Sequence, residues 1–214
     1  MSFVAIVDYG MGNLRSVAKA VEHVAPHGSV QVTSDAKVVA AAERVIFPGQ
    51  GAMPDCMREL KARGLREAVM DAAHNKPFLG ICIGLQMLFD MSEEGDQLGL
   101  GLLAGKVVRF PPDAHSPSGE KLKVPHMGWN EVEQTRSHPL WEGIASGSRF
   151  YFVHSYYPVP ADETLIVGCT TYASRIACAV ARTNLFAVQF HPEKSQAAGL
   201  RLLGNFLSWD GRAT

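Results

Sequence analysis

The sequence predicts an α/β fold with a mostly parallel central sheet flanked by helices and with additional antiparallel strands in the C-terminal half. In the first half, short apolar runs alternate with segments of helical periodicity, which is typical of parallel strands joined by helices. In the second half, apolar runs follow one another across short connections, as in β-hairpins. Because neither an internal repeat nor a linker interrupts this pattern, we expect a single domain over residues 1–214.

The first half begins with an apolar run at residues 3–8 and continues into a helix at residues 13–25, where Asn13 is suited to the N-cap. A longer helical pattern covers residues 57–74 and is broken at Gly64. The other elements expected here are strands at 30–33 and 44–47, an alanine-rich helix between them, and an apolar run that opens at Pro77.

The second half is rich in strands. They are expected at residues 106–110, 149–153, 165–172, 176–181 and 185–190. Residues 111–120 form a turn-rich loop, and leucines at helical spacing indicate a closing helix after Ser195, its expected N-cap.

Composition excludes several kinds of partner and compartment. Of the 214 residues, 47% are hydrophobic and 19% are charged, so the chain can bury a substantial core. The net charge is -1 and no block of Lys or Arg occurs, so we expect no binding to nucleic acid or to a membrane. No apolar run approaches the ~20 residues that span a bilayer. The N-terminal residues show no basic region or cleavage signal, so we expect no secretory peptide. Four irregularly spaced cysteines indicate reduced thiols in the cytoplasm and no metal site.

A cysteine between two glycines is the strongest chemical signal in the sequence. Gly80, Cys82 and Gly84 form Gly-x-Cys-x-Gly after an apolar run, which is the form of a nucleophile elbow at a strand-to-helix turn. Side chains at the glycine positions would collide with the neighbouring chain. A helix expected at residues 85–91 would favour the thiolate, and the Ile83 amide would donate to a developing oxyanion. The alternative is a buried structural cysteine, the role expected for the other three, Cys56, Cys169 and Cys178.

Of the eight histidines, His191 is the best candidate for the base. Pro192 biases its backbone toward an extended form, in which the side chains of His191 and Glu193 point the same way. The carboxylate can then hold one ring nitrogen and leave the other facing the thiol. His126 and His154 are candidates for lining the pocket. The remaining histidines are expected to be solvated: His23, His27, His74, His115 and His138.

Two glycine-rich turns follow predicted strands. Residues 44–47 run into Pro48-Gly49-Gln50-Gly51, whose backbone amides could supply a second oxyanion donor, although an ordinary turn is the alternative. The other turn, at residues 8–15, begins like a dinucleotide-binding motif but has Arg15 at the third glycine position. We therefore expect no nicotinamide cofactor.

The quoted motifs resemble those of class I glutamine amidotransferases, whose triad is Cys, His and Glu, over essentially the whole chain. More specifically, four segments resemble the glutaminase subunits of imidazole glycerol phosphate synthase, in histidine biosynthesis: residues 8–13, 48–53, 124–130 and 191–195. The resemblance implies a triad of Cys82, His191 and Glu193, oxyanion donors at Gly49 and Ile83, and L-glutamine held by Gly51, Gln86 and Glu94. Gln50 departs from the family, which often has a small apolar residue there.

The resemblance also implies a partner and no metal or organic cofactor. A (β/α)8 acceptor barrel takes about 250 residues, so the ammonia acceptor must be a separate cyclase subunit in a heterodimer. Asn13, Trp129 and Lys194 are candidates for the docking face, with Trp129 as an aromatic anchor or, alternatively, a core residue. We expect low activity of the isolated chain, with the turn at 48–51 presenting a carbonyl to the oxyanion until the partner docks.

Three other functions share part of this pattern. A glutaminase subunit of anthranilate or aminodeoxychorismate synthase would share the triad, but residues 125–130 and Lys194 argue against it. A cysteine-based α/β-hydrolase acting on esters fits the elbow but not the two-residue spacing of His191 and Glu193. A non-enzymatic binding module would be expected to lack one of the three catalytic residues, and none is missing.

Overall fold

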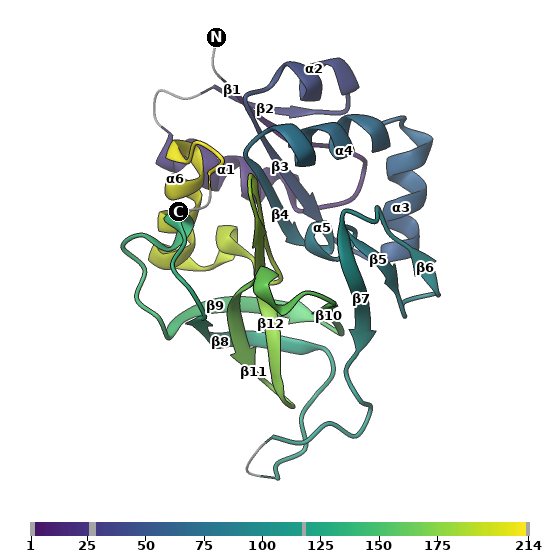
Figure 1. Cartoon of the computed structure of the whole chain (residues 1–214), viewed down its shortest axis with the longest axis vertical. Coiled ribbons are helices and arrows are strands. Elements are labelled where there is room, and N and C mark those ends of the chain that lie inside the picture. The colour runs from purple at the N-terminus through teal and green to yellow at the C-terminus, as the bar shows by residue number, and fades with distance from the viewer. Residues whose placement is uncertain (1–2, 26–28, 117–118, 213–214) are drawn as a thin grey trace.

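The computed structural model describes residues 3–25, 29–116 and 119–212. Its main feature is a nine-stranded mixed sheet with the order β2-β1-β3-β4-β13-β12-β11-β8-β9 (Figure 1). The expected α/β architecture is therefore confirmed. Expectations for His27 and for part of the loop at 111–120 lie outside the described residues.

Five neighbouring strands at one end of this sheet are parallel to one another. Its strands, in spatial order, are β2 Ser29–Thr33, β1 Phe3–Val7, β3 Arg44–Gly49, β4 Phe78–Cys82 and β13 Leu185–Val188. Strands β4 and β13 are buried along their whole length, as expected when helices cover both faces of a parallel sheet. Their carboxyl ends lie at one edge of the sheet, where sites in such folds collect.

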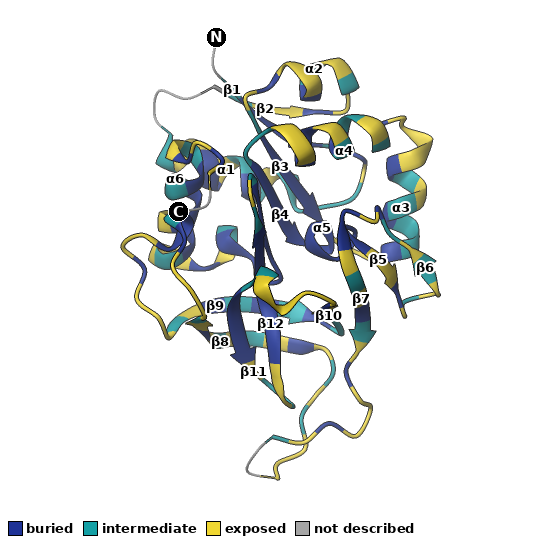
Figure 2. Ribbon diagram, viewed as in Figure 1, coloured by how far each residue is buried: buried dark blue, intermediate teal, exposed yellow. Residues whose placement is uncertain are grey.

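Helices cover both faces of the parallel strands (Figure 1). Helix α1 (Leu14–Val24) contacts α6 (Gln196–Ser208) on one face, and α2 (Ala36–Ala41) contacts α4 (Arg66–Asn75) on the other. Helix α3 (Met53–Ala62) precedes α4, and the break between them falls around Gly64 as expected. Figure 2 shows that these helices bury their sheet-facing sides and expose their outer sides, which is the amphipathic pattern that the sequence periodicity predicts.

The C-terminal side of the main sheet is antiparallel, as predicted. It continues through β12 Arg175–Arg182, β11 Ile166–Thr171, β8 His126–Gln134 and β9 Ser148–His154. A second sheet has the order β10-β7-β5-β6, with bounds Tyr156–Pro160, Leu103–Arg109, Phe89–Ser92 and Gln97–Leu98. One cluster of buried apolar residues joins the elements of both sheets.

The helix predicted at residues 85–91 is wrong. Helix α5 spans only Ile83–Gln86, and the chain then enters β5. The backbone carbonyls of Met87, Leu88 and Phe89 accept hydrogen bonds from the amides of residues 100–103 instead of from a following helical turn. A Cβ on Gly99 would lie 2.1 Å from the Phe89 carbonyl oxygen. The close approach of this distant segment therefore overrides the local helical pattern.

Three smaller expectations also need correction. Asn13 and Ser195 occupy N-cap positions, but neither side chain makes a capping hydrogen bond. The Ser195 hydroxyl donates instead to the carbonyl of His191, over 2.6 Å. His138 is buried and not solvated, because it packs between Phe186 and Trp209. Burial, aided by the positive charge of Arg136, lowers the pKa of His138 to about 4.

Candidate active site

Cys82 lies where β4 turns into α5, and its backbone is in the left-handed region with φ 56°. This conformation is unusual for a residue with a side chain, and strained residues of this kind cluster at functional sites. Ile83 is the first residue of α5, so its amide is one of those that a helix leaves without an intrahelical partner. The predicted elbow is therefore present.

Both flanking glycines lie against neighbouring backbone or strand. A Cβ on Gly84 would come within 1.9 Å of the Phe47 carbonyl oxygen on β3. A Cβ on Gly80 would come within 3.0 Å of the Ala187 side chain on β13. The collision expected from the sequence is thus confirmed at Gly84, whereas a side chain at Gly80 would make only a tight contact. Glycine at 84 allows β3 to pack directly beneath the elbow.

His191 and Glu193 lie together just beyond the end of β13. Nδ1 of His191 is 2.9 Å from Oε1 of Glu193, and both side chains are almost completely buried. The backbone of His191 is extended, as expected, but Glu193 belongs to a 3-10 turn, Pro192–Lys194. The side chains therefore meet through this turn and not through a continuous strand.

The imidazole of His191 has a raised pKa. Burial disfavours its charged form, but the Cys82 thiolate and the Glu193 carboxylate outweigh burial and raise the pKa of His191 above its ordinary value, to about 10. Its Nε2 has no hydrogen-bond partner among the described residues. The imidazolium form of His191 is therefore favoured, and its Nε2 is available to transfer a proton to a group in the cavity.

A cavity of about 270 Å³ opens over these groups. It brings together most of the predicted site residues, namely Gly51, Cys82, Ile83, Gln86, Glu94, His191 and Lys194. Gly49 is buried in β3, directly opposite Cys82 in the strand register, and does not line the cavity. A second oxyanion donor at Gly49 therefore stays a prediction.

Gln86 has one unused polar atom. Its Nε2 donates to the Tyr156 carbonyl and to Oε1 of Gln189, over 3.0 Å in each case. Its own Oε1 is buried and has no partner among the described residues. Because a buried amide oxygen without a partner is costly, this atom is suited to accept a hydrogen bond from a bound molecule.

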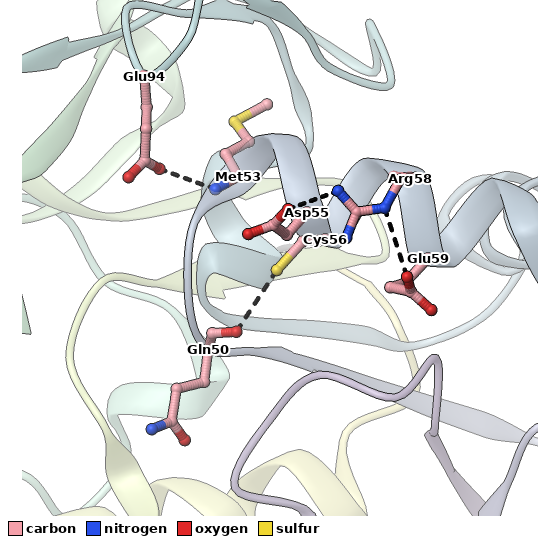
Figure 3. A network of polar contacts seen from close by, with 7 residues as sticks. All are labelled: Gln50, Met53, Asp55, Cys56, Arg58, Glu59 and Glu94. Carbon is pink, nitrogen blue, oxygen red and sulfur yellow. Dashed lines mark hydrogen bonds and ion pairs between the residues drawn. The ribbon is translucent and has the colours of Figure 1, made fainter.

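Glu94 and Gln50 are tied to helix α3 (Figure 3). Oε2 of Glu94 accepts from the amide of Met53, the first residue of that helix, over 2.8 Å. The thiol of Cys56 donates to the Gln50 carbonyl, over 3.5 Å. In a planar trans peptide the N–H points opposite to the C=O, so the Gly51 amide is directed away from Cys56.

His154 lines the cavity, as proposed from the sequence, but His126 does not line it and contacts His154 instead. His154 must donate from Nδ1 to the Tyr156 carbonyl, so its Nε2 accepts from Nδ1 of His126, over 2.9 Å. Nε2 of His126 then accepts from Nδ2 of the Asn130 side chain. Burial lowers the pKa of His126 to about 4, and burial together with His126 lowers that of His154 to about 3. Both rings are therefore neutral, in agreement with this directed chain.

The candidates for a docking face lie at the surface. Trp129 is 38% exposed, so it is not a core residue, and Met127, two positions earlier on β8, is 63% exposed. Lys194 is exposed and lies 5.7 Å from the ring of Tyr151. Asn13 is half-buried. The exposed apolar pair Met127 and Trp129 and the exposed cation of Lys194 are thus available to contact a partner.

Sequence reasoning missed Gln189, which is completely buried and contacts both Gln86 and Cys82. Its only sequence signal is an amide at the end of an otherwise apolar run. The other three cysteines are buried, as expected. Burial raises the pKa of the Cys56 thiol to about 11 and also raises the pKa of Cys169 and Cys178.

Curated relatives resemble this chain over nearly its full length. The family model described as Glutamine amidotransferase class-I matches residues 5–208. A protein of Aromatoleum aromaticum named imidazole glycerol phosphate synthase subunit HisH is 67% identical over 98% of this chain and 99% of its own length. Proteins of the same name from Nitrosospira multiformis and Dechloromonas aromatica are 66% and 65% identical, over 98% and 96% of this chain and 99% and 96% of their own.

Solved structures share the fold at low sequence identity. PurLQS from Thermotoga maritima superposes with a TM-score of 0.70 at 20% identity, covering 96% of this chain and 97% of that chain. A protein described as a glutamine amidotransferase gives 0.68 at 18% identity, with the same coverage.

Proposed function

The chain belongs to the class I glutamine amidotransferases and, among them, to the HisH subunits of imidazole glycerol phosphate synthase, and from this premise we propose how its residues act. The protein is a glutaminase that hydrolyses L-glutamine to glutamate and ammonia. The ammonia serves a cyclase, which makes imidazole glycerol phosphate and aminoimidazole carboxamide ribotide in L-histidine biosynthesis. The observation that carries the assignment of residues is the cavity containing Cys82 and His191, with Glu193 behind the imidazole.

The reaction proceeds in two steps. The Cys82 thiolate attacks the side-chain amide carbon of glutamine, and the C=O electron pair moves to oxygen, where the Ile83 amide stabilises it. The pair returns as the C–N bond breaks, and Nε2 of His191 gives its proton to the departing nitrogen, so that ammonia leaves and a γ-glutamyl thioester remains. His191 then takes a proton from water, which attacks the thioester and releases glutamate and the thiolate.

The substrate is held by polar residues of the cavity wall other than the base. We assign this role to Gln86, Glu94 and Gly51, all of which line the cavity. The unpaired Oε1 of Gln86 can accept from the α-ammonium or amide of glutamine, and the carboxylate of Glu94 can attract the α-ammonium. The second oxyanion donor is proposed to come from the strand end around Gly49.

Replacing His191 by Ala should reduce glutamine turnover about 10⁴-fold, because the general acid and base is lost. Glu193→Gln should cost less, because Glu193 acts through the imidazole and does not itself transfer a proton to the substrate. The Glu193 carboxylate helps raise the pKa of His191, so its removal should also move the alkaline limb of the pH profile of kcat/KM to lower pH. Steady-state assays across pH give both quantities. Equal losses for the two variants would give the carboxylate a larger role.

The partner is proposed to be the cyclase subunit, docked over the cavity mouth beside Trp129, Lys194 and Asn13. The exposed Met127 and Trp129 support an apolar centre for this face. We place the enzyme in the cytoplasm, which the four free thiols support. Within the described residues, no helix is long and apolar enough to cross a membrane.

The function is tested by measuring ammonia release from glutamine by this chain alone, with purified cyclase, and with cyclase plus its nucleotide ligand. We expect turnover to rise at least ~10²-fold between the first and last conditions, the size of one oxyanion donor gained. Full activity of the chain alone would refute the gating of the 48–51 turn, and no release under any condition would refute the function.

Trp129→Ala should weaken cyclase binding about 30-fold, or about 2 kcal/mol, the cost of losing an interface hot spot. Val32→Ala is a matched control, because Val32 is 41% exposed on the opposite edge strand of the sheet. Calorimetric titration measures both affinities. The same affinity for both variants would show that the cyclase does not dock on the face around Trp129.

A further inference from the structure

The side chain of Gln189 joins the nucleophile to the substrate-binding residue Gln86. Gln189 follows β13 directly, has no exposed surface, and is fixed by its backbone amide, which donates to the Cys178 carbonyl. Its Oε1 accepts from Nε2 of Gln86 over 3.0 Å, and its Nε2 lies 3.7 Å from Sγ of Cys82. A buried side-chain amide that makes two such polar contacts does more than occupy volume in the core.

The direction of these hydrogen bonds is determined by a backbone carbonyl. The oxygen of Tyr156 can only accept, so Gln86 must turn its NH₂ group toward it. The same NH₂ group reaches Gln189, which must therefore present its oxygen to Gln86. The NH₂ group of Gln189 is then left facing the sulfur of Cys82. The amide at position 189 thus cannot flip without breaking the contact to Gln86.

We propose that Gln189 is a further catalytic residue, which donates an N–H to Sγ of Cys82 and thereby stabilises the thiolate relative to the thiol. This inference rests on the proposed role of Cys82 as nucleophile. An anionic sulfur is the better acceptor, so a fixed donor favours the charged form. His191 and Gln189 thus have different roles toward the sulfur of Cys82. His191 exchanges the proton, and Gln189 contributes a hydrogen-bond donor that stays in place throughout the reaction.

The test is the pH dependence of Cys82 alkylation by iodoacetamide in the complete chain, followed by mass spectrometry of the Cys82 peptide. Only the thiolate reacts, and the raised pKa values of Cys56, Cys169 and Cys178 keep those thiols slow. Gln189→Met removes the donor and approximately keeps the volume, and Gln189→Glu keeps the oxygen that faces Gln86 but replaces the donor with an anion. We expect the midpoint of the profile to rise by about one pH unit in Gln189→Met, and by more in Gln189→Glu.

Gln134→Met is the matched control, because Gln134 also donates from Nε2, to the Ile144 carbonyl over 2.7 Å, but on β8 and outside the cavity. Its profile should coincide with that of the unmodified protein. If Gln189 had only a structural role, Gln189→Met would lower the stability of the protein but leave the alkylation midpoint equal to that of Gln134→Met and of the unmodified protein. That result would overturn the proposal while the function stands. If Gln189→Met does not fold, Gln189→Leu, which also removes the donor and adds no charge, decides by the same criterion. Absence of preferential alkylation at Cys82 in the unmodified protein would overturn the nucleophile assignment, and the role of Gln189 with it.

Discussion

Cys82→Ala should abolish glutamine-dependent synthesis, with a loss of at least ~10⁴-fold, while synthesis from free ammonia by the cyclase complex continues. The thiol forms the covalent intermediate, and external ammonia bypasses that step. The fold should persist, because alanine keeps a Cβ and meets the same backbone conformation at φ 56° as the cysteine it replaces. Parallel assays with glutamine and with an ammonium salt measure the two activities of one preparation.

Cys169→Ala provides the control for this experiment. Cys169 is also a buried free thiol, but it lies on β11 and does not line the cavity. Its replacement should leave both activities within about twofold of the original. Substantial glutamine turnover by Cys82→Ala would refute the assignment of the nucleophile, whereas loss of the ammonia-dependent activity would indicate a damaged complex.

Gly84→Ala should destabilise the protein by about 3 kcal/mol or more and reduce glutaminase activity at least ~10²-fold. The added Cβ would lie 1.9 Å from the Phe47 carbonyl oxygen, so either β3 or the elbow must move. Backbone atoms cannot rotate away as a side chain can, and the elbow carries the proposed nucleophile. Urea unfolding gives the stability, and kcat/KM gives the effect on the site.

Gly204→Ala, in helix α6, is the opposite case. The nearest atom to an added Cβ is 3.9 Å away, and the residue has an ordinary helical backbone. Alanine should therefore stabilise the protein by up to about 1 kcal/mol through helix propensity. Equal effects of the two substitutions would show that close packing at Gly84 does not determine the cost.

Local signals account for the parts of the site that sequence reasoning could predict. The glycines beside Cys82 report a steric requirement that acts within a few residues, and His191 reaches Glu193 two positions away. The alternation of strands and helices in the first half is equally local. Such features leave their pattern in the sequence wherever they occur.

The missed features depend on contacts between distant segments. Strand β10 contains Pro158 and Pro160, which are tolerated because it is the edge strand of its sheet. Strand β8 is largely exposed, so it lacks an apolar run. Gln189 acquires its role only through Cys82, 107 residues away in the sequence. No window of neighbouring residues contains that information.

The pairing of β4 with β13 also determines when activity can arise during synthesis and folding. Strand β4 carries the proposed nucleophile, and its parallel partner β13 leads into the proposed base, with Ile81 opposite Val188. Contacts of such high sequence separation form slowly, because a long loop must close before they are gained. A chain still emerging from the ribosome can form β1, β2, β3 and β4 with their helices, but it has no glutaminase until the segment through Glu193 has emerged and inserted beside β4. With these residues as the catalytic ones, we expect the topology alone to prevent incomplete chains from releasing ammonia.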